Sequence, residues 1–149
     1  QLSELNKIGL VLGELEYISA MTDITGFGLL GHVIEMAEGC GKNIELFYNN
    51  IPAMPGAKQY LAERIVPDAT YRNWNSFSKK VGFEKGVNVM EAFNLLSDPQ
   101  TNGGILFSCS PEKVDEVKDI LSKNGIAFTD AVGVVVGDGN KVVMVKNNS

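Results

Sequence analysis

A glycine-rich turn between two apolar segments limits how this chain can fold. Residues 21–32 read Met-Thr-Asp-Ile-Thr-Gly-Phe-Gly-Leu-Leu-Gly-His, so an acid, two hydroxyls and three glycines share one short stretch. Residues 17–21 are β-branched and aromatic enough to predict a short strand. Apolar residues then follow at the spacing of an amphipathic helix, namely Leu30, Val33, Ile34 and Ala37. The sequence therefore predicts a strand, a turn and a helix in succession.

This turn carries residue types that suit a metal-bound phosphate. Asp23 would lie beyond the strand end, and Gly26 and Gly28 can adopt positive φ or let a ligand approach the backbone. The first N–H groups of the following helix would point outward, where they attract anions. Asp23 is either an oxygen ligand of the kind that Mg²⁺ prefers or the cap of the turn. The spacing alone leaves both interpretations open.

The remaining periodicity predicts helices that alternate with strands. Helical patterns begin near the N-terminus, where Ser3 is a candidate cap, and again after Pro55, Asn88 and Ser110. The helix after Asn88 has a capping-box pattern, because a glutamate follows three residues later. The other predicted strands are residues 43–48 and 105–109.

Two further stretches complete the predicted layout. Residues 68–83 have no clear period, so we predict a long loop, whose length favours a functional role. Residues 132–136 and 142–145 are valine-rich and flank a glycine-rich turn, which predicts a β-hairpin. Together the pattern indicates an α+β, or layered α/β, fold with a mixed β-sheet of about four to six strands covered by helices.

Composition excludes several function classes. The chain has 149 residues and a net charge of −5, and its basic residues form no cluster, so we expect no nucleic-acid partner. No apolar run approaches the roughly 20 residues that span a bilayer, and no signal-peptide pattern is present. We therefore expect no membrane partner and a cytoplasmic location. The abrupt start on a helical pattern favours one domain, residues 1–149, of a longer protein.

The two cysteines predict no disulfide framework and lack the spacing of a metal site. Cys40 falls at a predicted helix end and Cys109 in a predicted strand. We expect both to be free thiols that behave as buried or half-buried small apolar residues.

Two motifs resemble one enzyme family. Residues 22–32, Thr-Asp-Ile-Thr-Gly-Phe-Gly-Leu-Leu-Gly-His, followed by Glu-Met-Ala at 35–37, resemble the opening of the C-terminal domain of selenophosphate synthetase, or selenide, water dikinase. Residues 98–104 resemble the same family's Asp-Pro-Gln-Thr-Ser-Gly-Gly, with Asn102 in place of the usual serine. The intervening residues 71–73, Tyr-Arg-Asn, also have a counterpart. Two motifs in the family's order are more specific than either alone.

The resemblance implies an activity and its cofactors. The family forms selenophosphate, orthophosphate and AMP from ATP, selenide and water, and it belongs to the aminoimidazole ribonucleotide synthetase superfamily, whose C-terminal domain fold we expect here. An N-terminal domain of the family holds the ATP-binding loop, the reactive Cys or Sec and most of the acidic Mg²⁺ ligands. We therefore expect that domain as a partner, a homodimer for the full-length protein, and no catalytic nucleophile within this chain.

The resemblance also implies candidate site residues. Asp23 matches the family's aspartate that joins the catalytic Mg²⁺. The candidate nucleotide-binding residues are Gly26, Gly28, Thr101, Gly103 and Gly104. Simple turn formation explains the glycines at least as well, and the spacing leaves that alternative open. His32 is typical of a packed, hydrogen-bonded histidine and Arg72 of an exposed arginine, although either could reach a ligand.

Two other functions remain compatible with the sequence. One is another ATP-using enzyme of the same superfamily, which the Gly-Phe-Gly-Leu-Leu-Gly-His form of the first motif disfavours. The other is a non-catalytic dimerisation or docking module.

Overall fold

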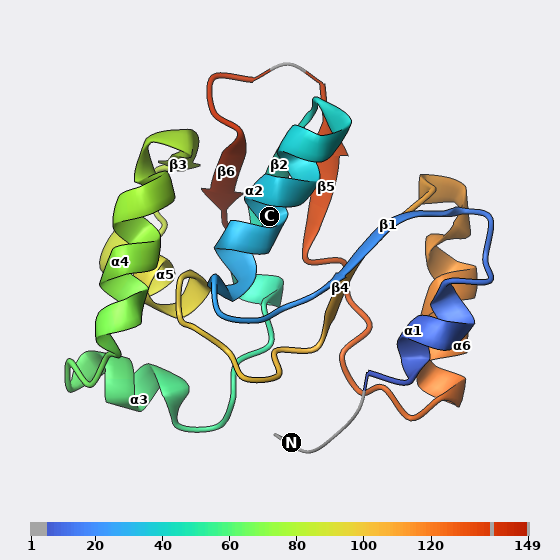
Figure 1. Cartoon of the computed structure of the whole chain (residues 1–149), viewed down its shortest axis with the longest axis horizontal. Coiled ribbons are helices and arrows are strands. Elements are labelled where there is room, and N and C mark those ends of the chain that lie inside the picture. The colour runs from blue at the N-terminus through green and yellow to red at the C-terminus, as the bar shows by residue number, and fades with distance from the viewer. Residues whose placement is uncertain (1–5, 138, 149) are drawn as a thin grey trace.

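Helices alternate with strands along most of the chain in the computed structural model, which describes residues 6–137 and 139–148 (Figure 1). The helices are α1 (Ile8–Leu12), α2 (Gly28–Cys40), α3 (Ala57–Ala62), α4 (Asp68–Phe77), α5 (Val89–Leu96) and α6 (Val114–Lys123). The strands are β1 (Ile18–Asp23), β2 (Asn43–Phe47), β3 (Val81–Phe83), β4 (Ile105–Cys109), β5 (Gly133–Val136) and β6 (Val143–Lys146). Short 3₁₀ turns are η1 (Tyr48–Asn50), η2 (Ser78–Lys80) and η3 (Pro111–Lys113).

Four strands form a mixed sheet in the order β3-β6-β2-β5. Strand β6 is parallel to both β3 and β2, whereas β5 is antiparallel to β2. Along β2, the buried Ile44 and Leu46 alternate with Glu45, which forms an ion pair of 2.6 Å with Lys146. Successive side chains of a strand point to opposite faces, so one face of the sheet is apolar and needs a cover.

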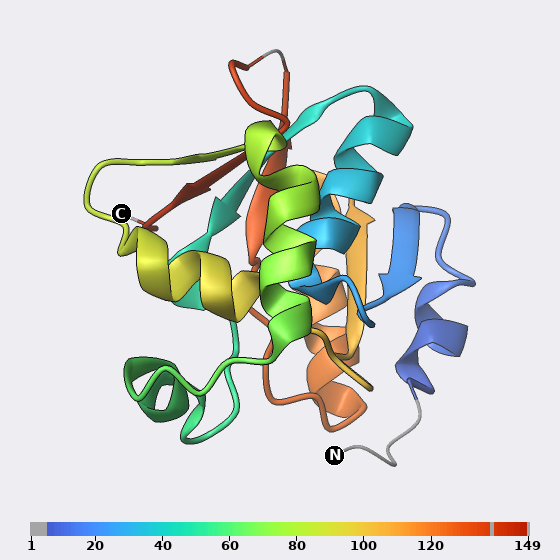
Figure 2. The ribbon, with the colours of Figure 1, turned by 60° about the vertical axis from the view of Figure 1, so that its left-hand side comes forward.

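Helices α2, α4 and α5 provide this cover and lie on the same face of the sheet (Figure 2). The predicted apolar face of α2 is confirmed, because its four members are all buried in the main core: Leu30, Val33, Ile34 and Ala37. Helix α5 begins as its capping-box pattern predicts, with the Asn88 side chain accepting a hydrogen bond of 3.3 Å from the Glu91 N–H. The α+β class predicted from the sequence is confirmed.

Strands β1 and β4 form a separate antiparallel pair. Helices α1 and α6 lie beside this pair, at the right of Figure 1, and supply a second, smaller core from Leu12, Val117 and Leu121. The other ends of the two strands lead toward the main core, where Leu106 of β4 is buried beneath α2. The strand pair therefore joins the two cores and carries the two sequence motifs at its inner end.

The prediction of a long loop over residues 68–83 is wrong. Residues 68–77 form helix α4, residues 78–80 form η2, and residues 81–83 form β3. The buried positions of α4 are Thr70, Asn73 and Phe77, which follow a helical spacing. Two of these three are polar, so a search for apolar periodicity does not detect the helix.

The predicted hairpin is also wrong. Strands β5 and β6 do not pair with each other, because β2 lies between them and pairs with both. The connection after β5 must therefore pass across β2 instead of reversing in a tight turn. Strand order is a long-range property, so two adjacent valine-rich runs do not reveal that a third strand separates them.

The predictions for the two cysteines had different outcomes. Cys40 is exposed, which contradicts the expected burial, because it is the last residue of α2. Its thiol donates a hydrogen bond to the Ala37 carbonyl at 3.4 Å. Cys109 is half-buried as expected, and both cysteines are free. The candidate cap Ser3 lies outside the described residues.

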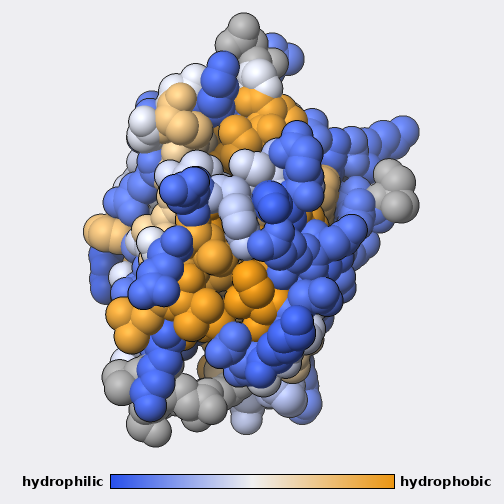
Figure 3. Space-filling model, turned by 90° about the vertical axis from the view of Figure 1, so that its right-hand side faces the viewer, coloured by the Kyte–Doolittle hydropathy of each residue, from blue (hydrophilic) through white to orange (hydrophobic). Residues whose placement is uncertain are grey.

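One face of the molecule carries apolar surface (Figure 3). The exposed large apolar side chains on α1, β1 and β5, the elements at that side of Figure 1, are Leu10, Val11, Met21, Val134 and Val135. In residues 6–137 and 139–148, no helix has both the length and the apolar character needed to cross a membrane.

Candidate functional site

The two motifs lie side by side because backbone pairing continues past the ends of β1 and β4. The last ladder pair joins Asp23 to Ile105. Beyond it, the Ile24 N–H donates to the Gly104 carbonyl at 2.9 Å, and the Gly103 N–H donates to the Ile24 carbonyl at 2.9 Å. Residues 22–28 and 98–104, which we call the first and second motif loops, thus form one paired unit.

Two glycines of these loops are required by close contacts. Gly28 has φ of +68°, and a Cβ atom there would lie 2.8 Å from the carbonyl oxygens of Leu96 and Asp98. At Gly103, a Cβ atom would lie 2.7 Å from the Ile24 side chain. The N–H of Gly28 also donates to the Thr25 carbonyl at 3.0 Å. Both glycines therefore shape the loops, and their N–H groups are already used within the protein.

The other candidate nucleotide-binding residues are more open. Gly26 and Thr101 are exposed, and in residues 6–137 and 139–148 their N–H groups have no acceptor. Gly104 has φ of +86° and open space on its Cβ side, although its N–H donates to the Asn102 side-chain oxygen at 3.4 Å. These three residues leave room for a ligand to approach the backbone.

Asn73 of α4 bridges the first motif loop and Ser97, the residue directly before the second motif loop. Its Nδ2 donates to the carbonyl of Gly26 at 2.8 Å and to the carbonyl of Ser97 at 3.0 Å. The sequence singled out Asn73 only as part of the resemblance at residues 71–73 and did not predict this role. The spacing of Thr70, Asn73 and Phe77 was the available signal, because it places the amide on the inner face of a helix.

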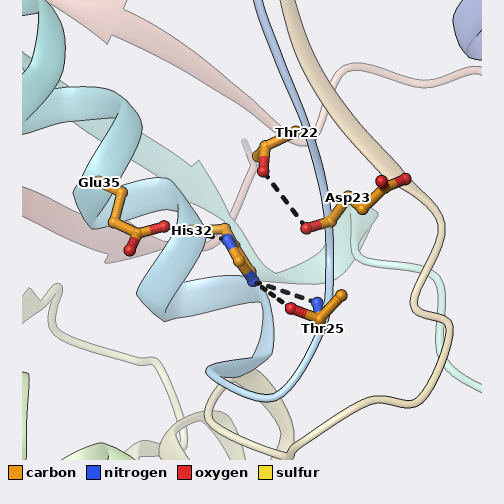
Figure 4. Close-up of polar contacts among 5 residues, drawn as sticks. All are labelled: Thr22, Asp23, Thr25, His32 and Glu35. Carbon is orange, nitrogen blue, oxygen red and sulfur yellow. Dashed lines mark hydrogen bonds and ion pairs between the residues drawn. The ribbon is translucent and has the colours of Figure 1, made fainter.

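His32 points from α2 back to the first motif loop (Figure 4). Its Nε2 accepts a hydrogen bond from the Thr25 N–H at 3.1 Å, and its Nδ1 lies 3.1 Å from the Glu35 carboxylate. The residue is only 6% exposed. The expected packed, hydrogen-bonded histidine is therefore confirmed.

Asp23 ends β1 with an exposed carboxylate that points away from His32 (Figure 4). The N-cap position of α2 is Phe27, so Asp23 does not cap that helix. One carboxylate oxygen accepts a hydrogen bond from the Asn6 side chain. This arrangement fits one oxygen ligand of a Mg²⁺ ion. Among the described residues no group of three or more His, Cys, Asp or Glu could hold a metal, so Asp23 would need ligands from elsewhere.

Asp98 has a structural position within the second motif loop. Thr70 donates to its Oδ1 at 3.4 Å, and Gln100 donates to its Oδ2 at 2.6 Å. Burial raises the pKa of Asp98 above its ordinary value, and the hydrogen bonds from Thr70 and Gln100 oppose that rise. This carboxylate anchors the loop against α4. Arg72, on the same helix, is exposed, as its sequence context predicted.

A small hollow between α2 and the strands β2 and β5 does not suit a nucleotide. Its lining is apolar and includes Met36, Leu106 and Val135. Phosphate groups need hydrogen-bond donors or cations, and this lining offers neither. The motif loops are therefore the better candidate site.

Comparison with known proteins agrees with the resemblance in the motifs. The family model described as AIR synthase related protein, C-terminal domain, matches residues 3–146. The chain is 40% identical over 133 residues to selenide, water dikinase of Enterobacter sp. (strain 638), a match that covers 89% of this chain and 37% of the relative. It is 39% identical over 144 residues to selenide, water dikinase of Photorhabdus laumondii, covering 97% of this chain and 40% of the relative. The chain thus spans about two fifths of these relatives.

We predict that Asn73→Ala destabilises the protein by about 1–3 kcal/mol, because it leaves the Gly26 and Ser97 carbonyls without their shared donor. Asn75→Ala is the matched control, since Asn75 lies exposed on the same helix. Urea unfolding of both variants measures the difference. Equal stability of the two variants would show that Asn73 does not hold the loops together.

The position of Asp98 predicts a pH dependence of stability. Because its pKa is raised in the folded state, folding favours the protonated form. The stabilisation from this group is complete below about pH 4 and is lost as pH rises through the folded-state pKa. Asp98→Asn lacks the ionisation, so the stability of the wild type relative to this variant should fall from pH 4 to pH 7. A difference that does not change between pH 4 and pH 7 would contradict the assignment.

Proposed function

Because the chain belongs to the AIR synthase related proteins as a C-terminal domain, we propose that it is the C-terminal domain of a selenide, water dikinase. The proposed activity is ATP-dependent synthesis of selenophosphate from selenide, with release of AMP and phosphate. The observation that carries this proposal is the paired unit of the two motif loops, since the residues that resemble the dikinases converge on it. Relatives of that name at 39% and 40% identity support the same conclusion.

Asp23 is the proposed Mg²⁺ ligand of this domain. A bound Mg²⁺ would neutralise the charge that develops on phosphate oxygens during phosphoryl transfer. The exposed carboxylate at the end of β1 supports this role, because it is accessible to a ligand while its backbone is fixed by the ladder to β4. The remaining ligands would come from the N-terminal domain that the family resemblance implies.

The motif loops are the proposed contact with ATP. Gly26 and Thr101 would approach the phosphates through backbone N–H groups that have no acceptor among the described residues. Gly104, whose N–H donates to the Asn102 side-chain oxygen, would instead let a phosphate come close through the open space on its Cβ side. Gly28 and Gly103 would contribute by fixing the loop shape, since their own N–H groups bond within the protein. With the nucleotide held from this side, the domain would exclude water from the phosphorylated intermediate until selenide arrives.

This division of work defines the proposed partners. The N-terminal domain would supply the reactive Cys or Sec, the glycine-rich loop and the other carboxylates, and the full-length protein would act as a homodimer in the cytoplasm. The nucleophile is assigned outside this chain, because Cys40 and Cys109 lie at the far ends of α2 and β4 from the motif loops. On this proposal the chain alone forms no AMP.

The test is Asp23→Asn in the protein that also carries the N-terminal domain. The substitution keeps the size of the side chain and removes one anionic ligand, so turnover should fall by more than about 100-fold. The free energy of unfolding should change by less than about 1 kcal/mol, because the side chain is exposed. Steady-state AMP formation and thermal unfolding measure the two effects.

Asp119→Asn, an exposed change on α6, serves as the matched control and should keep full turnover. Near-normal selenophosphate formation by Asp23→Asn, with unchanged Mg²⁺ dependence, would refute the metal role.

A further inference from the structure

His32 is the only histidine of the chain, and its contacts select one tautomer of the neutral ring. The Nε2 atom meets two groups of Thr25, the backbone N–H at 3.1 Å and the hydroxyl at 3.3 Å. The hydroxyl can donate or accept, whereas the backbone N–H can only donate, so Nε2 must present its lone pair. The proton of a neutral imidazole then lies on Nδ1, which can donate to Glu35 at 3.1 Å. A doubly protonated ring would place an N–H against the Thr25 N–H. The bonded state is therefore the neutral Nδ1–H tautomer.

These contacts hold Thr25 from both sides. Its N–H donates to His32, while its carbonyl accepts from the Gln100 N–H at 3.1 Å and from the Gly28 N–H at 3.0 Å. Thr25 stands two residues after Asp23 and directly before Gly26. Fixing its two peptide groups therefore sets the path of the backbone between the proposed Mg²⁺ ligand and the first open glycine.

The position of His32 favours this indirect role over contact with substrate. Its ring is 6% exposed, and the exposed Phe27 ring lies edge-on to it at 6.2 Å between centroids. The Asp23 carboxylate points to the other side of the strand (Figure 4). The imidazole thus acts through the peptide group that it holds.

We propose that His32 is a positioning residue: its neutral Nδ1–H tautomer, oriented by Glu35, holds the first motif loop in the shape that binds Mg²⁺ and ATP. The arrangement matches the general rule that outer residues orient the groups that touch a metal. This inference rests on the proposed function, and its structural half can be measured without activity.

Two amide variants separate the hydrogen bond from the bulk of the ring. The Oε1 atom of glutamine in His32→Gln reaches the Nε2 position and can accept from Thr25. The shorter side chain of His32→Asn reaches only the Nδ1 position and cannot. On this chain, nuclear magnetic resonance should detect the Nδ1–H tautomer in the wild type. The Thr25 amide should exchange slowly in the wild type and His32→Gln, and at least about tenfold faster in His32→Asn.

The second measurement uses the protein with its N-terminal domain and Mg²⁺–ATP as the probe. His32→Asn should raise the KM for Mg²⁺–ATP by about 10- to 100-fold, whereas His32→Gln should keep a KM close to that of the wild type. Ile34→Ala is the control for lost stability, because Ile34 is buried on the same helix and its side chain belongs to the main core. It should lower the free energy of unfolding and leave KM within about twofold of the wild type.

Several results would overturn the proposal. An Nε2–H tautomer, or a Thr25 amide that exchanges equally fast in all variants, would refute the hydrogen bond. A KM that rises equally in His32→Asn, His32→Gln and Ile34→Ala would show that the rise comes from lost folding stability and not from the lost hydrogen bond. If His32→Asn leaves KM unchanged while Asp23→Asn abolishes turnover, the positioning role fails and the proposed function stands. If neither variant alters turnover or KM, the proposed function itself fails.

Discussion

The reciprocal hydrogen bonds between Ile24 and the Gly103–Gly104 backbone are the constraint on which the candidate site depends. They extend the β1–β4 ladder by one step beyond Asp23, into residues that would otherwise be two unrelated loops. Close packing then makes glycine necessary at Gly28 and Gly103, because a side chain at either would meet backbone or Ile24. The conformation of both motifs therefore follows from one short stretch of strand pairing, and the polar contacts build on it.

The two cores give this pairing its rigidity. At one end of the strand pair, α1 and α6 pack around Leu12, and at the other end α2 and the mixed sheet bury Leu106. Helix α4 adds Asn73, whose amide donates to Gly26 of the first motif loop and to Ser97, directly before the second. A buried amide that donates to two carbonyls is costly to displace. The loops are consequently held on three sides and left open at Asp23, Gly26 and Thr101, where the proposed ligands would enter.

Local patterns in the sequence predicted much of this fold, and the failures have a common cause. The strand, turn and helix around residues 17–38 and the cap at Asn88 depend on neighbouring residues, so they could be predicted. Helix α4 could not, because its inner face buries Thr70 and Asn73, whose partners lie far away in the chain. The insertion of β2 between β5 and β6 and the contact of His32 with Thr25 likewise depend on tertiary structure. The motifs identified the candidate site, whereas its supporting residues became visible only in the fold.

Native-state hydrogen exchange of the Ile24 and Gly103 amides tests the central claim most directly. If strand pairing unites the motif loops, both amides should exchange slowly and with a common opening free energy, similar to that of the Leu106 amide in β4. Exchange of Ile24 and Gly103 at the rate of an exposed loop, while Leu106 remains protected, would contradict the account. The motifs would then be independent loops, and no single paired unit could position Asp23.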